Sequence, residues 1–154
     1  MNSYFFDSSA LVKRFARESG TSWLFGLFRQ NTSSTIFSAR VTHVEVSSAL
    51  ARRAKAGSFD KDAEERYSRR LARLFEFSFL KIELTDELTS EAVRLTRKHF
   101  LRGYDAVQLA AALYIERELK ASGLSSLIFV SADSELNSAA LTEGLTVENP
   151  NDHP

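Results

Sequence analysis

The sequence predicts an α/β fold with a mainly parallel sheet that is covered by helices on both faces. Short apolar segments bounded by polar residues are typical of buried strands, and they recur along the 154 residues. Longer segments with helical periodicity lie between them, and this alternation favours parallel strands joined by right-handed helical crossovers. We expect one domain over residues 1–149, followed by a frayed tail over residues 150–154.

Five segments have the character of short strands. In the first of them, SYFFD, three aromatic residues stand between polar neighbours. The others read STIFSA, FLKIEL, SSLIFVSAD and LTVEN. The predicted strands span residues 3–7, 34–39, 79–84, 125–133 and 145–149.

Seven segments have the spacing of helices. The first places Leu11, Val12 and Phe15 on one face and has Gly20 as its stop signal. A later segment is apolar around most of its circumference, which is typical of a helix in the middle of a core. The predicted helices span residues 8–20, 21–31, 41–57, 60–78, 85–100, 106–119 and 134–144.

The composition narrows the class of protein. Apolar residues make up 44% of the chain and charged residues 26%, as in an ordinary soluble domain, and no apolar run approaches the length of a membrane span. The first residues lack the pattern of a signal peptide. The absence of cysteine excludes disulfides, zinc fingers and thiol catalysis, and suits a cytoplasmic protein. Twenty basic residues balance twenty acidic ones, which argues mildly against long-range attraction to a polyanion.

Four acidic residues from distant parts of the chain fall at comparable places in this pattern. Asp7 and Asp133 close predicted strands, Glu45 lies early in the helix after a strand, and Asp105 lies at the start of the apolar helix. In a parallel sheet the carboxyl ends of the strands share one edge, where functional groups gather. We therefore expect these four carboxylates to converge on one pocket.

Helix capping is the simpler explanation for each of these acids alone. Asp is a favoured N-cap, and Glu45 stands three residues after Thr42, the spacing of a capping box. Capping does not explain why acids stand in surroundings as apolar as YFFD and YDAVQLAAAL, because a buried charge is costly unless it is paired or binds metal. Four carboxylates in one pocket would repel one another, so either their pKa values rise or a cation lies among them.

The ligand types indicate a hard cation. Oxygen ligands without histidine or cysteine are typical of Mg²⁺ or Mn²⁺ sites. The three histidines, His43, His99 and His153, have no metal-binding spacing. Carboxylates that hold such a cation are the apparatus of phosphoryl transfer, because the metal activates water and stabilises charge on the phosphate.

These stretches resemble the PIN-domain family, especially the VapC-like ribonuclease toxins of toxin–antitoxin pairs. The resemblance covers nearly the whole chain and rests on FFDSSALVKRF, THVEVSSALARR, RGYDAVQLAAAL and FVSADSEL. It implies a three-layer α/β/α sandwich, Mg²⁺- or Mn²⁺-dependent cleavage of RNA by one or two ions, a homodimer, and a cognate antitoxin that blocks the site.

The resemblance also assigns residues by position. Asp7, Glu45, Asp105 and Asp133 match the family's acidic quartet, with Asp7 and Asp105 as the most direct ligands. Ser9 and Ser131 match hydroxyl positions that support the site, although local backbone bonding explains them equally well. A further acid often follows the fourth; here that place is held by Glu135, for which a solvated first-turn acid is the better interpretation.

Several basic and aromatic residues are candidates for contact with RNA. Arg102 stands close to Asp105, and Arg52 follows Glu45 by about two helical turns; we take these two arginines as the candidate contacts. A solvated helix face is the better interpretation for a stripe of three arginines in the segment 60–78. Core packing or a dimer surface is preferred over base stacking for the aromatic residues of the segment 21–31. The stripe consists of Arg66, Arg70 and Arg73, and the aromatic residues are Trp23, Phe25 and Phe28.

Three alternatives stay open on the sequence alone. The first is a catalytically inactive PIN-like module that binds RNA or protein, which the intact quartet weakens. The second is another acidic-site enzyme, but a haloacid-dehalogenase-like phosphatase needs an Asp where Ser9 stands, and a receiver domain needs a late Lys after a strand, whereas Lys120 lies inside a helix. The third is a structural domain whose acids only cap helices, and it predicts that the four carboxylates lie apart.

Overall fold

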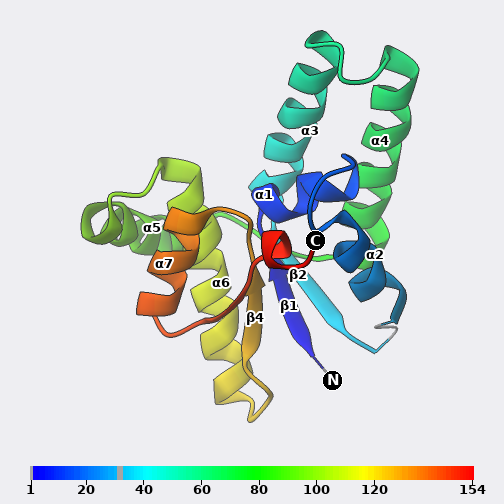
Figure 1. Cartoon of the computed structure of the whole chain (residues 1–154). Helices are drawn as coiled ribbons and strands as arrows, with labels where there is room; N and C mark the ends of the chain where they lie inside the picture. The colour runs from blue at the N-terminus through cyan, green and yellow to red at the C-terminus, as the bar shows by residue number, and fades with distance from the viewer. Residues whose placement is uncertain (1, 31–32) are drawn as a thin grey trace.

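A central parallel sheet organises the molecule. The computed structural model describes residues 2–30 and 33–154, and within them five strands form one sheet in the order β3-β2-β1-β4-β5. Every neighbouring pair of strands is parallel, as the sequence predicts, and β1 lies at the centre of the sheet (Figure 1). The strands are β1 (Ser3–Phe6), β2 (Thr35–Ala39), β3 (Leu80–Ile82), β4 (Leu127–Val130) and β5 (Thr146–Glu148).

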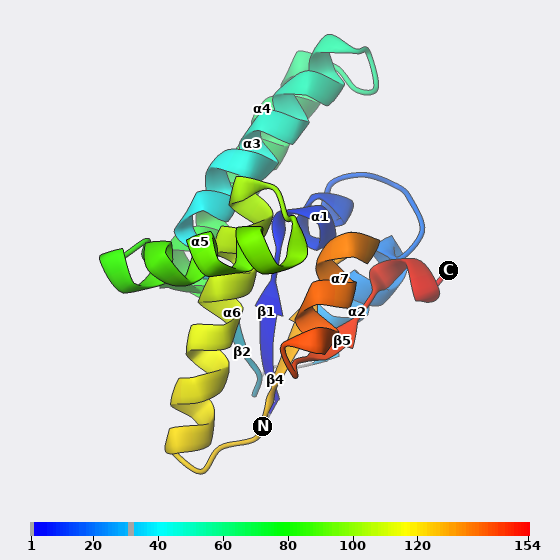
Figure 2. The same ribbon diagram turned by 90° about the vertical axis from the view of Figure 1, so that its left-hand side faces the viewer.

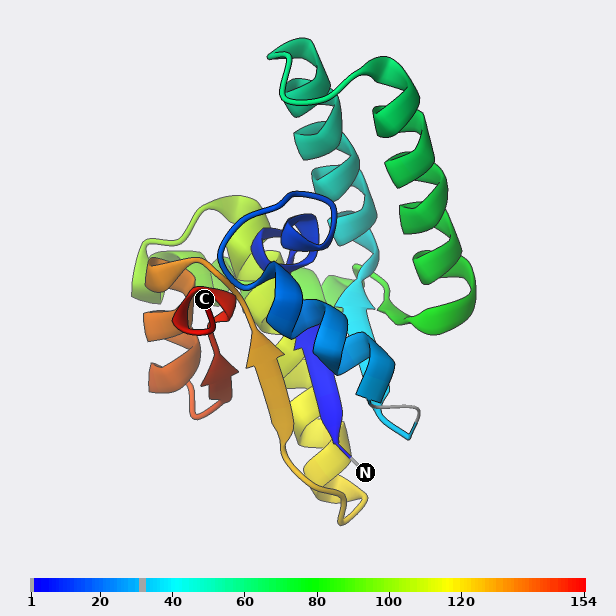
Figure 3. The same ribbon diagram turned by 45° about the vertical axis from the view of Figure 1, so that its right-hand side comes forward.

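Helices cover both faces of the sheet, so the prediction of a three-layer sandwich is confirmed. In Figure 3, α2 crosses in front of β1 and β4, whereas α6 lies behind them. In these residues no helix has the length and apolar character that a membrane crossing requires. The α-helices are α1 (Ser8–Leu11), α2 (Thr21–Gln30), α3 (Arg40–Lys55), α4 (Lys61–Arg73), α5 (Asp86–His99), α6 (Gly103–Ala121) and α7 (Ser134–Thr142).

The alternation of side chains along β1 divides the core between the two faces. Phe5 points to the face covered by α6, where it stacks on Phe129 of β4 with ring centroids 5.8 Å apart. Tyr4 and Phe6 point to the other face and pack with Leu24 of α2. Successive side chains of a strand point to opposite faces, so a strand buried on both sides must be apolar throughout. This explains the aromatic run in the first predicted strand.

A pair of helices extends beyond the carboxyl ends of the strands. Figures 1 and 2 show α3 and α4 running side by side as an antiparallel arm away from the sheet. Leu50 of α3 packs with Leu71 of α4 inside the arm. After Arg73 the chain continues as a π-helix over Leu74–Ser78, so the predicted helix 60–78 consists of an α-helix followed by a π-helix.

The predicted helix 8–20 is shorter than expected. After α1, the residues Val12–Arg14 form a 3-10 helix, and α2 begins at Thr21. The hydroxyl of Thr21 donates to the carbonyl oxygens of Lys13 (2.9 Å) and Ala16 (2.7 Å), which holds the chain in a turn instead of a continuing helix. The predicted helix 21–31 is α2, except that residue 31 lies outside the described residues.

The tail differs from the frayed segment that we expected. Residues Pro150–Asp152 form a 3-10 helix, and Pro150 is buried. The ring of His153 stacks on Trp23 of α2 with centroids 4.2 Å apart, and its Nε2 atom lies 3.0 Å from a carboxylate oxygen of Glu148. Gly20 (φ +86°) makes this approach possible, because a Cβ atom there would overlap Pro150. We call residues 149–153 the C-terminal strap.

Candidate active site

Asp7 is the most buried of the four acids. It follows β1 and caps α1, and its Oδ1 atom accepts a hydrogen bond from the backbone N–H of Ala10 at 2.9 Å. The hydroxyl of Ser9 lies 2.8 Å from each of its carboxylate oxygens, and the hydroxyl of Ser131 donates to Oδ2 at 2.9 Å. With 1% of its surface exposed, Asp7 is held in one orientation by groups from β1, α1 and the end of β4.

The two predicted serines join the ends of β1 and β4. Ser131 lies directly after β4, and its hydroxyl oxygen accepts from the backbone N–H of Asp133 at 3.2 Å. The hydroxyl of Ser9 accepts from the backbone N–H of Ala132 at 2.9 Å. Each serine therefore bonds both to the backbone and to Asp7, but only Ser131 makes the local backbone bond that the sequence left open, because the backbone partner of Ser9 belongs to a distant segment.

Burial changes the protonation of Asp7. Removal from water raises the pKa of its carboxyl group from an ordinary value of 3.8 to about 7, because the charged form loses hydration. The hydrogen bonds from Ala10, Ser9 and Ser131 lower the pKa, and repulsion from Asp105 raises it further. Without a cation, the carboxyl group of Asp7 is thus protonated in a substantial fraction of the molecules near pH 7.

Asp105 interacts electrostatically with each of the other three acids. It is half-buried in the first turn of α6, whose N-cap is Arg102, and the Arg102 side chain makes no capping bond. Burial raises the pKa of Asp105, repulsion from Asp133 and Glu135 raises it further, and the nearby Arg102 lowers it. Asp105 also raises the pKa values of Asp7 and Glu45 by repulsion. Four acids from four elements therefore interact electrostatically around this residue.

Capping explains two of the acids and fails for the other two. Asp7 and Asp133 accept bonds from N–H groups of α1 and α7, respectively, as caps do. Glu45 lies beyond the first turn of α3, where Ala39 is the N-cap and makes no side-chain bond. The third alternative, in which the acids only cap helices, does not account for Glu45 and Asp105, but no three acids in the described residues are placed around one ion, so this alternative stays open.

Glu45 has a partner that the sequence analysis missed. The side-chain amide of Gln108, fully buried in α6, donates to a carboxylate oxygen of Glu45 at 2.5 Å and to the hydroxyl of Thr42 at 2.8 Å. The pKa of Glu45 is raised by burial and lowered by this bond. The polar residue in the middle of the segment AVQLAAAL could have indicated such a partner, because a buried side-chain amide requires hydrogen-bond partners.

An open pocket of about 410 Å³ gives access to part of this cluster. Its lining combines acids and one arginine, and Arg102 is therefore placed beside the acids, as predicted. Arg52 lies higher on α3, exposed, and bonds the hydroxyl of Ser48 at 3.1 Å. The pocket is lined by Arg102, Asp105, Ala132, Asp133, Ser134 and Glu135.

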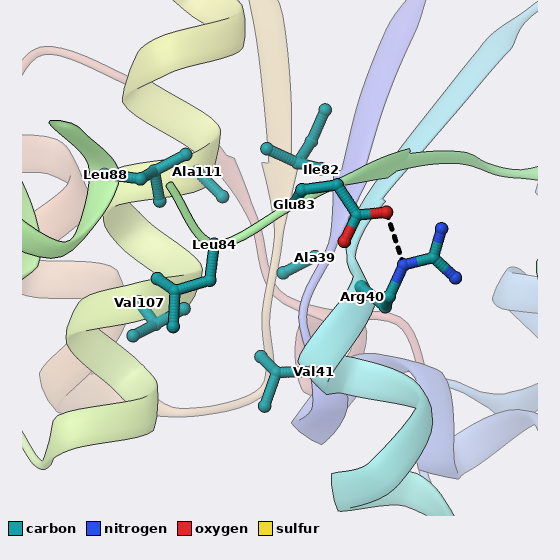
Figure 4. Close-up of a pocket in the computed structure, with 9 residues that line it drawn as sticks. All are labelled: Ala39, Arg40, Val41, Ile82, Glu83, Leu84, Leu88, Val107 and Ala111. Atoms are coloured by element: carbon teal, nitrogen blue, oxygen red, sulfur yellow. Dashed lines mark hydrogen bonds and ion pairs between the residues drawn. The ribbon is translucent and has the colours of Figure 1, made fainter. Parts of the chain in front are cut away.

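A second pocket of about 200 Å³ lies beyond the start of α3 and is mainly apolar. Figure 4 shows Leu84, Val107 and Val41 around it, with the Arg40 side chain bonded to Glu83 at its rim. Its polar groups are already paired with each other. Of these two pockets, only the first is lined by acids of the predicted quartet, Asp105 and Asp133.

The acids suit a cation by type, although their side chains are not already closed around one point. Among residues 2–30 and 33–154, no group of three or more His, Cys, Asp or Glu side chains is placed to ligate one ion. The acids offer only oxygen atoms as ligands. Repulsion between them contributes, after burial, to the raised pKa values of three of the acids. A hard divalent cation would therefore offset this repulsion. The three histidines make their contacts elsewhere: His43 stacks on Phe75, His99 bonds Glu143 and His153 bonds Glu148.

The sequence of the chain matches a known family. A sequence model described as the PIN domain matches residues 4–140. The chain is a member of the PIN-domain family. This PIN-domain protein is 32% identical over 147 residues to Ribonuclease VapC45 of Mycobacterium tuberculosis, and the match covers 93% of this chain and 92% of that protein. The chain is thus VapC-like in sequence.

Solved structures share the fold of this PIN-domain protein. VapC20 of M. tuberculosis, described as a toxin that cleaves the sarcin–ricin loop, superposes with a TM-score of 0.64 at 14% identity over 88% of this chain and 94% of the other. VapBC2 of Rickettsia felis, bound to a DNA fragment from its promoter, superposes with a TM-score of 0.60 at 13% identity over 96% and 98%. At this identity the likeness shows the fold alone.

Proposed function

We propose that the protein is an endoribonuclease that hydrolyses RNA phosphodiesters with the aid of Mg²⁺ or Mn²⁺, and that it is the toxin of a toxin–antitoxin pair. The observation that carries the proposal is the convergence of Asp7, Glu45 and Asp133 on Asp105, with pKa values raised in three of the four. The name of the relative VapC45 as a ribonuclease supports the reaction class. The VapBC2 structure supports an antitoxin partner.

The four carboxylates would hold the cation, and the rest of the site orients them. When bound, the cation supplies Lewis acidity that favours ionisation of an attacking water and neutralises charge on the phosphate. Ser9 and Ser131 hold both oxygens of Asp7 in place. Gln108 fixes the direction of Glu45. Arg102 lines the same pocket, and its guanidinium is suited to contact a phosphate of the RNA.

We further propose a homodimer, a cognate antitoxin and a cytoplasmic location, as in the family that the sequence resembles. The runner-up is a catalytically inactive PIN-like module that binds RNA or protein. It is favoured by one observation, that no group of three ligands is already placed for an ion in the described parts of the chain.

Cleavage and unfolding assays with and without the cation distinguish the ribonuclease from the inactive binding module. Purified protein is expected to cut labelled RNA in millimolar Mg²⁺ or Mn²⁺ and to lose this activity in EDTA. Because the cation binds the native state, a concentration of ten times its Kd should also raise the free energy of unfolding by about 1.4 kcal/mol. If neither metal produces cleavage or a shift of the unfolding midpoint, the inactive module is the correct assignment.

The role of Gln108 gives a separate prediction. Gln108→Met retains the size of the side chain but cannot donate to Glu45, so the Mn²⁺ concentration required for half of the thermal shift is expected to rise about 10–100-fold. Thr42→Val is the control, because it removes the hydroxyl next to Gln108 and leaves the bond to Glu45. An unchanged Mn²⁺ response in Gln108→Met, with the unfolding transition still cooperative, would show that this bond does not matter for the site.

A further inference from the structure

Arg14 is a half-buried cation that has no polar partner for its side chain among residues 2–30 and 33–154. It ends the 3-10 helix after α1, and its guanidinium lies over the rings of Phe28 (4.3 Å) and Phe25 (4.9 Å) of α2. Its Nη1 atom is buried without a hydrogen-bond partner, and among the residues described Arg14 has no ion pair. The buried Nη1 atom is out of reach of an external ligand, but Arg14 as a whole is only partly buried, so an acceptor at the surface can bond its remaining N–H groups.

The charged neighbour of Arg14 is another cation. Burial lowers the pKa of Arg14, and repulsion from Arg70 of α4 lowers it further, with no carboxylate acting in the opposite direction. Arg70 is exposed and likewise has no ion pair within the described parts of the chain. Two arginines that are close enough to repel each other are suited to share an anion.

The same face of α4 extends this positive charge. Arg66, Arg70 and Arg73 are spaced i, i+4 and i+7, so they follow one side of the helix. Each is exposed, and none has a hydrogen bond or ion pair to another residue in the ranges that the structure covers. Arg69 stands i+3 from Arg66 and borders the same face, but it lies 3.9 Å from Glu65. Three of the four arginines on this side of α4 are therefore without an ion pair in the described residues.

We propose that Arg14 together with Arg66, Arg70 and Arg73 binds the backbone phosphates of a single RNA strand that leads to the acidic site. The proposal rests on the proposed function, because it places the substrate of that reaction. A row of cations suits a repeating polyanion better than one carboxylate, and guanidinium groups bind phosphate oxygens in pairs. We call these four residues the arginine track.

The position of the arginine track suits this role. Arg14 follows Asp7 by seven residues, which corresponds to roughly 10 Å along a helix, so one strand can pass both. Phe25 beside Arg14 is 40% exposed, and an exposed ring next to a phosphate contact offers a surface on which a base can stack. The sequence analysis treated this stripe as a solvated face, since the proximity of Arg14 to Arg70 depends on the fold.

Binding measured without cleavage tests the arginine track. Fluorescence anisotropy of a labelled single-stranded RNA is measured with Asp105→Asn protein in Mg²⁺, alone and with Arg14→Gln or Arg70→Gln added. Each added substitution is expected to weaken binding about tenfold and to reduce the slope of log K against log salt by about 0.7 per lost phosphate contact. Arg97→Gln removes the same charge from an exposed position of α5, which lies away from α4 (Figure 1), and should leave both quantities close to those of the parent.

The outcomes are distinct. If Arg70→Gln, a surface change that should not lower the unfolding midpoint, binds RNA as Arg97→Gln does, the proposal is wrong. If instead a glutamate-rich peptide loses affinity in Arg70→Gln while RNA does not, the surface belongs to an acidic protein segment, and the RNA proposal is again wrong. Loss of RNA affinity confined to the arginine track supports it even if the parent chain never cleaves RNA, in which case only the proposed reaction fails.

Discussion

Asp105→Asn is expected to reduce RNA cleavage by roughly 10²–10³-fold or more and, at the same time, to stabilise the cation-free protein. Asp105 repels Asp7 and Glu45 and is itself repelled by Asp133. An amide in its place removes a negatively charged oxygen ligand and also removes these repulsions. The two effects are measured by cleavage of labelled RNA in Mn²⁺ and by thermal unfolding in EDTA.

Asp86→Asn is the matched control for this substitution. Asp86 is an exposed first-turn acid of α5, as Asp105 is a first-turn acid of α6. Asp86 does not contribute to the raised pKa values of Asp7, Glu45 or Asp105. It should change neither cleavage nor the response to metal. Equal activity of Asp105→Asn and Asp86→Asn would remove Asp105 from the catalytic site, and a lowered unfolding midpoint in EDTA would contradict the electrostatic account.

Asp7→Asn is expected to remove most of the pH dependence of stability between pH 4 and pH 7. The carboxyl of Asp7 has a pKa of about 7 in the folded protein, against 3.8 for the ordinary group. The folded state therefore keeps a proton that the unfolded state releases, so the free energy of unfolding falls as pH rises from about 4 to 7 and then levels off. The shift corresponds to about 4 kcal/mol, as one pKa unit is about 1.4 kcal/mol.

Urea unfolding at a series of pH values, in EDTA, measures this slope. Wild-type protein should lose stability as pH rises through the interval, whereas Asp7→Asn should lose much less and should be the more stable of the two at pH 8. Asp152→Asn serves as the control, because Asp152 is exposed in the C-terminal strap. A wild-type curve that is flat from pH 4 to 7 would mean that Asp7 is not desolvated as the structure indicates.

The sequence was sufficient for the sheet and for two of the acids. An aromatic run such as YFF suits a strand that is buried on both faces, and polar residues at the carboxyl ends of such strands meet at one edge. These two rules place Asp7 and Asp133 after the neighbouring strands β1 and β4, whereas Asp105 follows α5 and its position depends on how α6 packs. That the four acids bind a metal stays a prediction.

The remaining features depend on contacts between distant segments. Gln108 meets Glu45 only because α6 and α3 lie side by side, and the C-terminal strap is held by Trp23 and Gly20, more than 120 residues earlier in the chain. The shortened first helix follows from the hydroxyl of Thr21, which reaches carbonyls on the preceding turn. Periodicity reports neither kind of contact, because it describes one segment at a time.

The C-terminal strap has a practical consequence for handling the protein. The side chain of Asn151 reaches the carbonyl of Ala132, next to Asp133, at 3.4 Å, and the backbone carbonyl of Asn151 accepts from Ser19 at 3.5 Å. An affinity tag or fluorescent fusion joined after Pro154 would pull on the segment that steadies the Asp133 loop. Fusions are better placed at the N-terminus, which lies at the amino end of β1 (Figure 1), on the side of the sheet away from the acids.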